Sequence, residues 1–162
     1  MTTHNPTTIT AQPDTPYVDI ERHFDATPAQ LFRAYTDPEL ITQWLGPRSL
    51  TMELLEFDPR PGGKYRYVHR RGSEAYYFNG VYHTVSKDER IIQTFEFEGA
   101  PGEVCLESVT FENHDGGTRM RSHSTFPSVD ARDAAVASGM ESGIIESHER
   151  LDELTATSTG QE

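Results

Sequence analysis

Hydrophobic and polar residues alternate along much of the chain between residues 17 and 126, and this alternation predicts a sheet. In the first run, YVDIERHF at 17–24, Val18, Ile20 and Phe24 fall on one side of an extended chain, as in a strand with one buried face. Six further runs follow, separated by turn residues such as Asp58-Pro59. They predict antiparallel strands joined by hairpins at 50–57, 63–71, 74–86, 90–98, 103–114 and 118–126.

Two short helices are predicted after the first strand. The segment TPAQ at 27–30 has the form of a capping box with proline at the first helical position, where its missing N–H costs nothing. This helix should end near the DP pair at 37–38. A second short helix should begin there, carry Trp44, and end at the GP pair at 46–47.

After residue 127 the hydrophobic period becomes that of a helix. The apolar stripe comprises Val136, Met140, Gly143, Ser147, Leu151 and Leu154, which predicts one long helix from 130 to 155 with Asp130 as its cap. Gly139 and Gly143 each cost such a helix about 1 kcal/mol relative to alanine. Two explanations stay open: a close approach of the sheet, or room for a ligand beside the helix.

The element order predicts an α+β domain over residues 17–155, between a disordered leader at 1–16 and a frayed tail at 156–162. Each element has one apolar face, so a seven-stranded antiparallel sheet should curl around the long C-terminal helix. Side chains rarely fill the space inside such a curl completely, and the gap becomes a pocket.

Composition and charge limit the kinds of partner that the protein is expected to bind. The 162 residues carry 26 acidic and 14 basic side chains, a net charge of −12, which would repel a nucleic-acid backbone. The chain has no apolar run near the roughly 20 residues that a membrane-spanning helix needs, so we expect no membrane insertion. A single cysteine, Cys105, fits a cytoplasmic protein. The histidines show no metal-binding spacing, so we expect neither metal nor cofactor.

Five fragments in the expected order carry a family resemblance. They are FDATPAQLFRAYTDPELITQWLGP, FDPRPGGKYRY, FNGVYHTVSKDERIIQTFEFEG, VTFENHDGGTRMR and GMESGIIESHERLDEL. Together they resemble the bacterial single-domain homologues of the heat-shock-protein-90 ATPase activator, which belong to the START-like (SRPBCC) superfamily. The resemblance covers about residues 17–154. It implies the helix-grip fold, with a cavity between sheet and C-terminal helix that takes small, largely apolar ligands.

The sequence departs from the family pattern at two places. Ile144 and Leu45 stand where the family often has aromatic residues, and Ser122 and Ser124 stand where bulky apolar residues are usual. Both changes substitute smaller groups. If the backbone does not collapse, the pocket should be larger or differently polarised than in relatives.

The strand register and the helix stripe together predict the residues that line this cavity. Five of them, His69, Gln93, Glu107, Ser122 and Ser124, are polar groups on an apolar wall, and they need either a ligand or one another and water as partners. The full predicted lining is Trp44, Tyr65, Tyr67, His69, Gln93, Phe95, Glu107, Val109, Phe111, Met120, Ser122, Ser124, Met140, Gly143, Ile144 and Ser147. The direction of the side chains on the 74–86 strand stays undecided, because that strand is apolar on both sides.

The leading functional hypothesis is a binding domain for a small hydrophobic molecule, with no catalytic residues assigned. A second hypothesis, taken from the superfamily, is a polyketide cyclase or aromatase-like enzyme that uses the same cavity. A third is a co-chaperone that touches a chaperone partner through its outer surface. A homodimer also stays open, since symmetric dimers are common.

Overall fold

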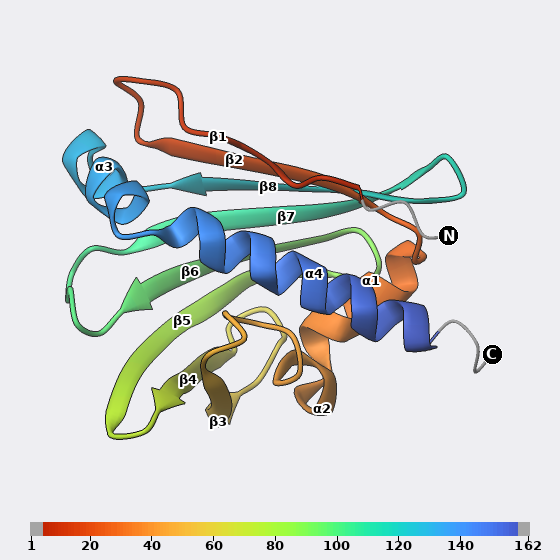
Figure 1. The fold of residues 1–162 in the computed structure, drawn as a ribbon, viewed down its shortest axis with the longest axis horizontal. Helices are drawn as coiled ribbons and strands as arrows, with labels where there is room; N and C mark the ends of the chain where they lie inside the picture. The colour runs from red at the N-terminus through yellow and green to blue at the C-terminus, as the bar shows by residue number, and fades with distance from the viewer. Residues whose placement is uncertain (1–4, 159–162) are drawn as a thin grey trace.

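The computed structural model describes residues 5–158 and is built on one curled antiparallel sheet with a helix across its concave face (Figure 1). The strands lie in the order β1-β2-β8-β7-β6-β5-β4-β3. Their bounds are Thr8–Thr10 (β1), Tyr17–Phe24 (β2), Thr51–Phe57 (β3), Lys64–Arg71 (β4), Glu74–Ser86 (β5), Arg90–Phe97 (β6), Cys105–His114 (β7) and Gly117–Thr125 (β8). The α+β class and the curled sheet are confirmed, with one strand more than expected.

The additional strand lies in the segment that we expected to be a disordered leader. β1 pairs antiparallel with β2, with Ile9 opposite Ile20. The Thr7 hydroxyl also lies 3.0 Å from Nδ1 of His148 on the last helix. The threonine–isoleucine alternation favours a strand, and the open edge of β2 offers it a partner. The expectation of disorder is therefore wrong at Thr8–Thr10, while residues 1–4 lie outside the described residues.

The helices after β2 begin where the sequence predicts. α1 spans Pro28–Thr36, and its capping box is present: the Gln30 N–H donates to Oγ1 of Thr27, and the Thr27 N–H donates to Oε1 of Gln30. α2 spans Pro38–Ile41 and is capped by the Asp37 carboxylate. It is shorter than predicted, and the chain continues to the sheet as a loop, 42–50.

The single long helix expected at 130–155 is instead two helices. α3 spans Val129–Ala137 and α4 spans Met140–Ser158. Gly139 has φ +91°, a left-handed conformation that ends α3 and that residues with a Cβ rarely adopt. α4 continues two residues into the segment where we expected a frayed tail, and residues 159–162 lie outside the described part of the chain.

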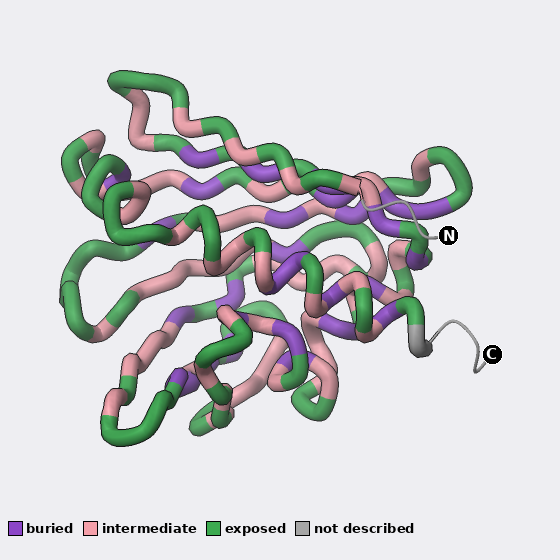
Figure 2. Tube along the Cα trace, viewed as in Figure 1, coloured by how far each residue is buried: buried purple, intermediate pink, exposed green. Residues whose placement is uncertain are grey.

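The hydrophobic core lies at the end of the sheet covered by α1. Buried residues, purple in Figure 2, gather on the strands and on the second half of α4. Leu31 of α1, Trp44 of the loop and Leu151 of α4 meet there and are almost fully buried. The Trp44 indole N–H donates to the carbonyl of Ala34, which satisfies its polar atom. Among residues 5–158, no helix has the length and apolar character that crossing a bilayer requires.

Candidate functional site

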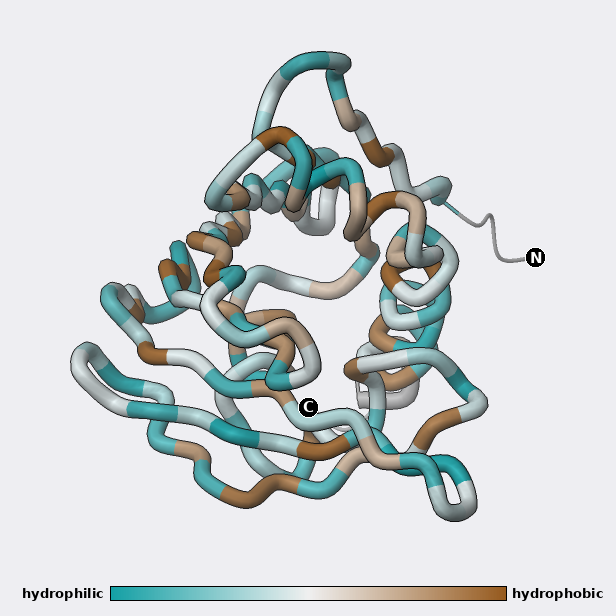
Figure 3. Tube along the Cα trace, turned by 90° about the vertical axis from the view of Figure 1, so that its left-hand side faces the viewer, coloured by the Kyte–Doolittle hydropathy of each residue, from teal (hydrophilic) through white to brown (hydrophobic). Residues whose placement is uncertain are grey.

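A pocket of about 430 Å³ lies between the concave face of the sheet and α4. Strands β2 to β8, the 42–50 loop and α4 all contribute to its lining. Figure 3 shows the chain from the side, with hydrophobic and hydrophilic residues interspersed along its trace. The volume is within the range of small-molecule sites, which run from roughly 300 to 1,000 Å³.

The predicted cavity residues line this pocket with two exceptions. Those on its wall are Trp44, Tyr65, Tyr67, His69, Gln93, Phe95, Glu107, Val109, Ser122, Ser124, Met140, Gly143, Ile144 and Ser147. Phe111 and Met120 are inward-facing as expected but lie outside the pocket. The Tyr35 hydroxyl is 3.6 Å from Sδ of Met120, and the Tyr35 and Phe111 rings are 5.4 Å apart. The prediction was wrong for these two because α1 covers their end of the sheet and fills it.

Several lining residues were not predicted from the sequence. Phe78 and Tyr82 line the pocket from β5, whose direction the sequence left undecided. The pairing of Tyr67 with Phe78 across β4 and β5 fixes that direction. Met52 and Leu54 of β3 could have been found from their alternation alone. The remaining unpredicted lining residues are Ile20, Tyr35, Ile41, Leu45, Gly46, Pro47, Leu50, Phe57, Ile91, Ser108 and His148.

Stacked aromatic rings form one wall of the pocket. The rings of Tyr67 and Phe78 are nearly parallel at 5.1 Å, and those of Phe78 and Phe95 are nearly parallel at 5.4 Å. Gly80 makes room for the neighbouring Tyr65, because a Cβ there would lie 2.5 Å from the Tyr65 ring and 2.1 Å from the Thr94 carbonyl oxygen. The wall is therefore a rigid apolar surface on which flat or extended molecules could lie.

A polar row crosses the aromatic and aliphatic lining. Ser124, Glu107, Gln93 and Tyr82 are cross-strand neighbours on β8, β7, β6 and β5. The Glu107 carboxyl is hydrogen-bonded to the side chains of Ser124 and Gln93. Burial outweighs these bonds and raises the pKa of Glu107 to about 7, because a charged carboxylate is disfavoured away from water. A carboxyl with this pKa can both accept and donate a proton near neutral pH.

Tyr65 lies beside this row, and its hydroxyl group makes two hydrogen bonds. The Tyr65 hydroxyl donates to the Thr94 carbonyl at 2.6 Å and accepts from Nε2 of Gln93 at 3.2 Å. Burial raises the pKa of Tyr65 well above its usual value, so its hydroxyl stays protonated.

His69 lies at another part of the pocket wall, under the 42–50 loop. Its Nε2 is buried and has no hydrogen-bond partner among the described residues. Burial lowers the pKa of the imidazole, while a hydrogen bond with the Leu45 backbone opposes that shift. The ring fits against Gly46, where a Cβ would lie 2.7 Å from Nε2. A neutral imidazole therefore supports the loop and leaves one polar atom unsatisfied beside the pocket.

Gly143 of α4 settles one of the open alternatives. A Cβ at this position would meet nothing within 4 Å, so the sheet does not approach the helix closely here. The glycine instead widens the pocket, which favours the second explanation given for it above. Gly139, by contrast, adopts the left-handed conformation that separates α3 from α4.

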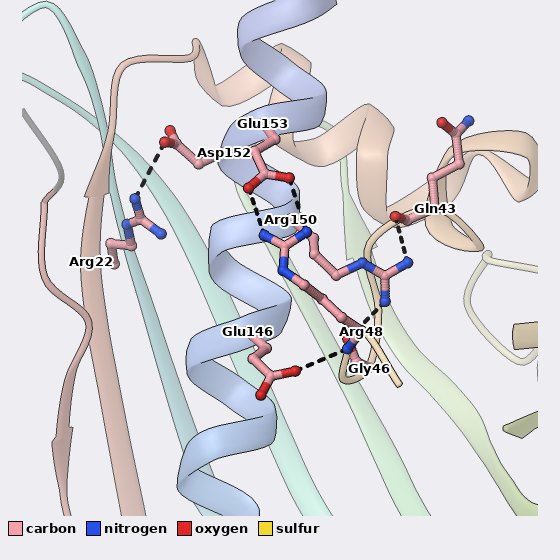
Figure 4. Close-up of polar contacts among 8 residues, drawn as sticks. All are labelled: Arg22, Gln43, Gly46, Arg48, Glu146, Arg150, Asp152 and Glu153. Atoms are coloured by element: carbon pink, nitrogen blue, oxygen red, sulfur yellow. Dashed lines mark hydrogen bonds and ion pairs between the residues drawn. The ribbon is translucent and has the colours of Figure 1, made fainter. Parts of the chain in front are cut away.

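Polar contacts tie the 42–50 loop to α4 (Figure 4). The Gly46 N–H donates to Oγ of Ser147 at 2.8 Å. The Arg150 guanidinium donates to the carbonyls of Gln43 and Gly46, each at 2.9 Å. Arg48 adds an exposed ion pair with Glu153. The loop supplies Trp44, so its attachment to α4 sets part of the pocket's shape.

Cys105, the single cysteine of the chain, is buried. Burial raises the pKa of the Cys105 thiol to about 12, so the thiol is protonated at neutral pH and a poor nucleophile. Within residues 5–158, no three His, Cys, Asp or Glu side chains converge as a metal site would require.

Comparison with known proteins places the chain in a family. The family model described as "Activator of Hsp90 ATPase homolog 1-like protein" matches residues 25–156. No curated protein matches the chain significantly.

Solved structures of bacterial proteins share the fold. One from Rhodobacter sphaeroides is 28% identical with a TM-score of 0.86, covering 94% of this chain and 99% of that chain. One from Mycobacterium smegmatis is 25% identical with a TM-score of 0.83, covering 92% and 96%. One from Arthrobacter aurescens, at 22% identity and a TM-score of 0.85, covers 93% and 91% and shows the fold alone. The resemblance inferred from the sequence is thereby confirmed, together with the START-like architecture.

Proposed function

Because this chain belongs to the Activator of Hsp90 ATPase homolog 1-like family, we propose that it is a binding protein for a small hydrophobic molecule, held between the sheet and α4. The observation that carries the proposal is the pocket of about 430 Å³, whose wall is mostly aromatic and aliphatic. A ligand that fills the pocket removes apolar surface of both the ligand and the protein from water. Each Å² of apolar surface removed contributes about 25 cal/mol to the free energy of binding.

The pocket is also open where the chain could have filled it. Gly143 adds no side chain, and Ser122 and Ser124 add only small ones to its wall. An enzyme using the same pocket and a co-chaperone acting through the surface stay predictions.

The test uses the one tryptophan of the chain, Trp44, which lines the pocket. The panel consists of long-chain alcohols, monoglycerides and polycyclic aromatics. We expect some members to change the fluorescence of Trp44 and to raise the melting temperature. At a ligand concentration of a hundred times Kd, binding should stabilise the folded protein by about 3 kcal/mol. A panel without any such change would contradict the proposal.

A filled-pocket variant sharpens the test. In Gly143→Phe, the new ring projects into open space, so binding should fall at least about ten-fold while the fold is kept. Ile145→Phe is the matched control, since Ile145 is exposed on the same helix and does not line the pocket. Equal affinity of the two variants would show that the ligand binds elsewhere.

A further inference from the structure

The polar row raises the question of which chemical group of a ligand it would receive. Among residues 5–158, the pocket lining holds no lysine and no arginine. Its one acidic side chain is Glu107. A ligand carboxylate would therefore face Glu107 without a compensating cation, and like charges at close range in a buried site are strongly unfavourable.

Three donors close to Glu107 are already engaged. Gln93 has two amide protons; one goes to the Tyr65 hydroxyl oxygen at 3.2 Å, and the other serves its hydrogen bond to Glu107. The Tyr65 hydroxyl proton goes to the Thr94 carbonyl at 2.6 Å. The Ser124 hydroxyl proton serves the second bond to Glu107. These three groups leave no free proton for a ligand at this point.

Acceptor capacity, in contrast, is left over. An ionised carboxylate has about four lone-pair positions on its two oxygens, and the protein donates to it from two side chains. Glu107 keeps part of its surface open because it faces the pocket. Glu107 can therefore accept a further hydrogen bond, from a donor on a ligand.

Resting on the proposed function, we propose that the pocket selects a neutral, mainly apolar molecule that carries a hydroxyl group, which donates to the carboxylate of Glu107. The hydroxyl meets the acceptor, and the apolar remainder lies on the wall of Tyr67, Phe78 and Phe95. The neighbouring phenols of Tyr67 and Tyr82 stay protonated and neutral, since burial raises the pKa of each, so among these three side chains Glu107 alone carries a negative charge near pH 8.

The test compares three probes with one scaffold: 4-phenylphenol, biphenyl and biphenyl-4-carboxylate. Each is titrated calorimetrically into the wild-type protein at about pH 8, where a phenol is neutral and Glu107 is mostly ionised. We expect 4-phenylphenol to bind at least about ten-fold tighter than biphenyl, and biphenyl-4-carboxylate to bind weakest. This ranking needs no variant, so it tests the inference even if a substitution at Glu107 impairs folding.

The variant Glu107→Gln assigns the selection to this residue. Removing the charge should reduce the ratio of the affinities for 4-phenylphenol and biphenyl-4-carboxylate at least about ten-fold. Glu112→Gln, on the exposed side of the same strand, should keep the wild-type ranking.

The outcomes separate the two proposals. Equal binding of all three probes, or preference for the carboxylate, would overturn the donor assignment and leave ligand binding in place. If biphenyl and 4-phenylphenol both fail to bind, the proposed function fails and the inference fails with it.

Discussion

At the residue scale, alternation predicted five polar residues that lie on the pocket wall, and it also predicted two apolar residues that lie outside the pocket. The strict alternation along β4, β6, β7 and β8 puts His69 and Glu107 on the same face as their apolar neighbours, and the structure has them there. Phe111 and Met120 follow the same alternation, yet they lie beneath α1. Which part of an inward face stays uncovered depends on where a helix from elsewhere in the chain packs, and local periodicity does not contain that information.

Glu107 should make the stability of the protein depend on pH. Its pKa rises from 4.5 unfolded to about 7 folded, so folding favours the protonated form. Burying the ionised Glu107 carboxylate therefore lowers the free energy of unfolding. This loss is absent below about pH 4.5, grows as pH rises and is complete above about pH 7. At 1.36 kcal/mol per pKa unit it reaches about 3 kcal/mol.

Urea unfolding at several pH values measures this effect. The stability of Glu107→Gln relative to wild type should increase between about pH 4.5 and pH 7 and then level off. Glu112→Gln, at an exposed position of the same strand, is the matched control. A difference between Glu107→Gln and wild type that does not vary with pH would refute the burial argument.

At the element scale, the sequence predicts where helices begin more accurately than where they end. The capping box at Thr27 and the Asp37 cap appear as the sequence predicts. The break at Gly139 was read as an interior position of one long helix, because the apolar period runs through it. A glycine in a helical pattern is compatible with an interior site and with a C-terminal cap, and the direction of the following chain decides between them.

Arg150 should control the 42–50 loop. Its guanidinium satisfies the carbonyls of Gln43 and Gly46, and hydrogen bonds from a charged donor contribute about 1.5–3 kcal/mol each. In Arg150→Ala, we expect amide hydrogen exchange in residues 42–50 to accelerate by roughly ten-fold or more, with faster release of any pocket ligand.

Arg48→Ala is the comparison for this loop. It removes an ion pair with Glu153 that is exposed, and solvent screening leaves such pairs with little effect on stability. Its effect on exchange should be clearly smaller than that of Arg150→Ala. Equal effects of both substitutions would mean that charge, and not the carbonyl contacts, holds the loop.

At the scale of the whole molecule, the first and last parts of the chain complete the fold together. β2 lies between β1 and β8, and Thr7 reaches His148 of α4. Removal of residues 1–10 should expose the edge of β2, lower stability by about 1–2 kcal/mol and increase self-association, because an unpaired strand edge is a template for another chain. Thermal unfolding and light scattering measure both effects, and an unchanged protein would show that β1 is dispensable.

The sequence by itself determined the periods of the elements, the inward faces of most strands and the family, because these follow from local alternation and short motifs. The tertiary structure decided the pairing of β1, the direction of β5, the end of α3 and the part of the inner face that α1 fills. Each of these depends on contacts between segments far apart in the chain, such as Tyr35 with Phe111 and Ser147 with Gly46. The free energy of such contacts is set by the assembled fold, so no local pattern could specify them.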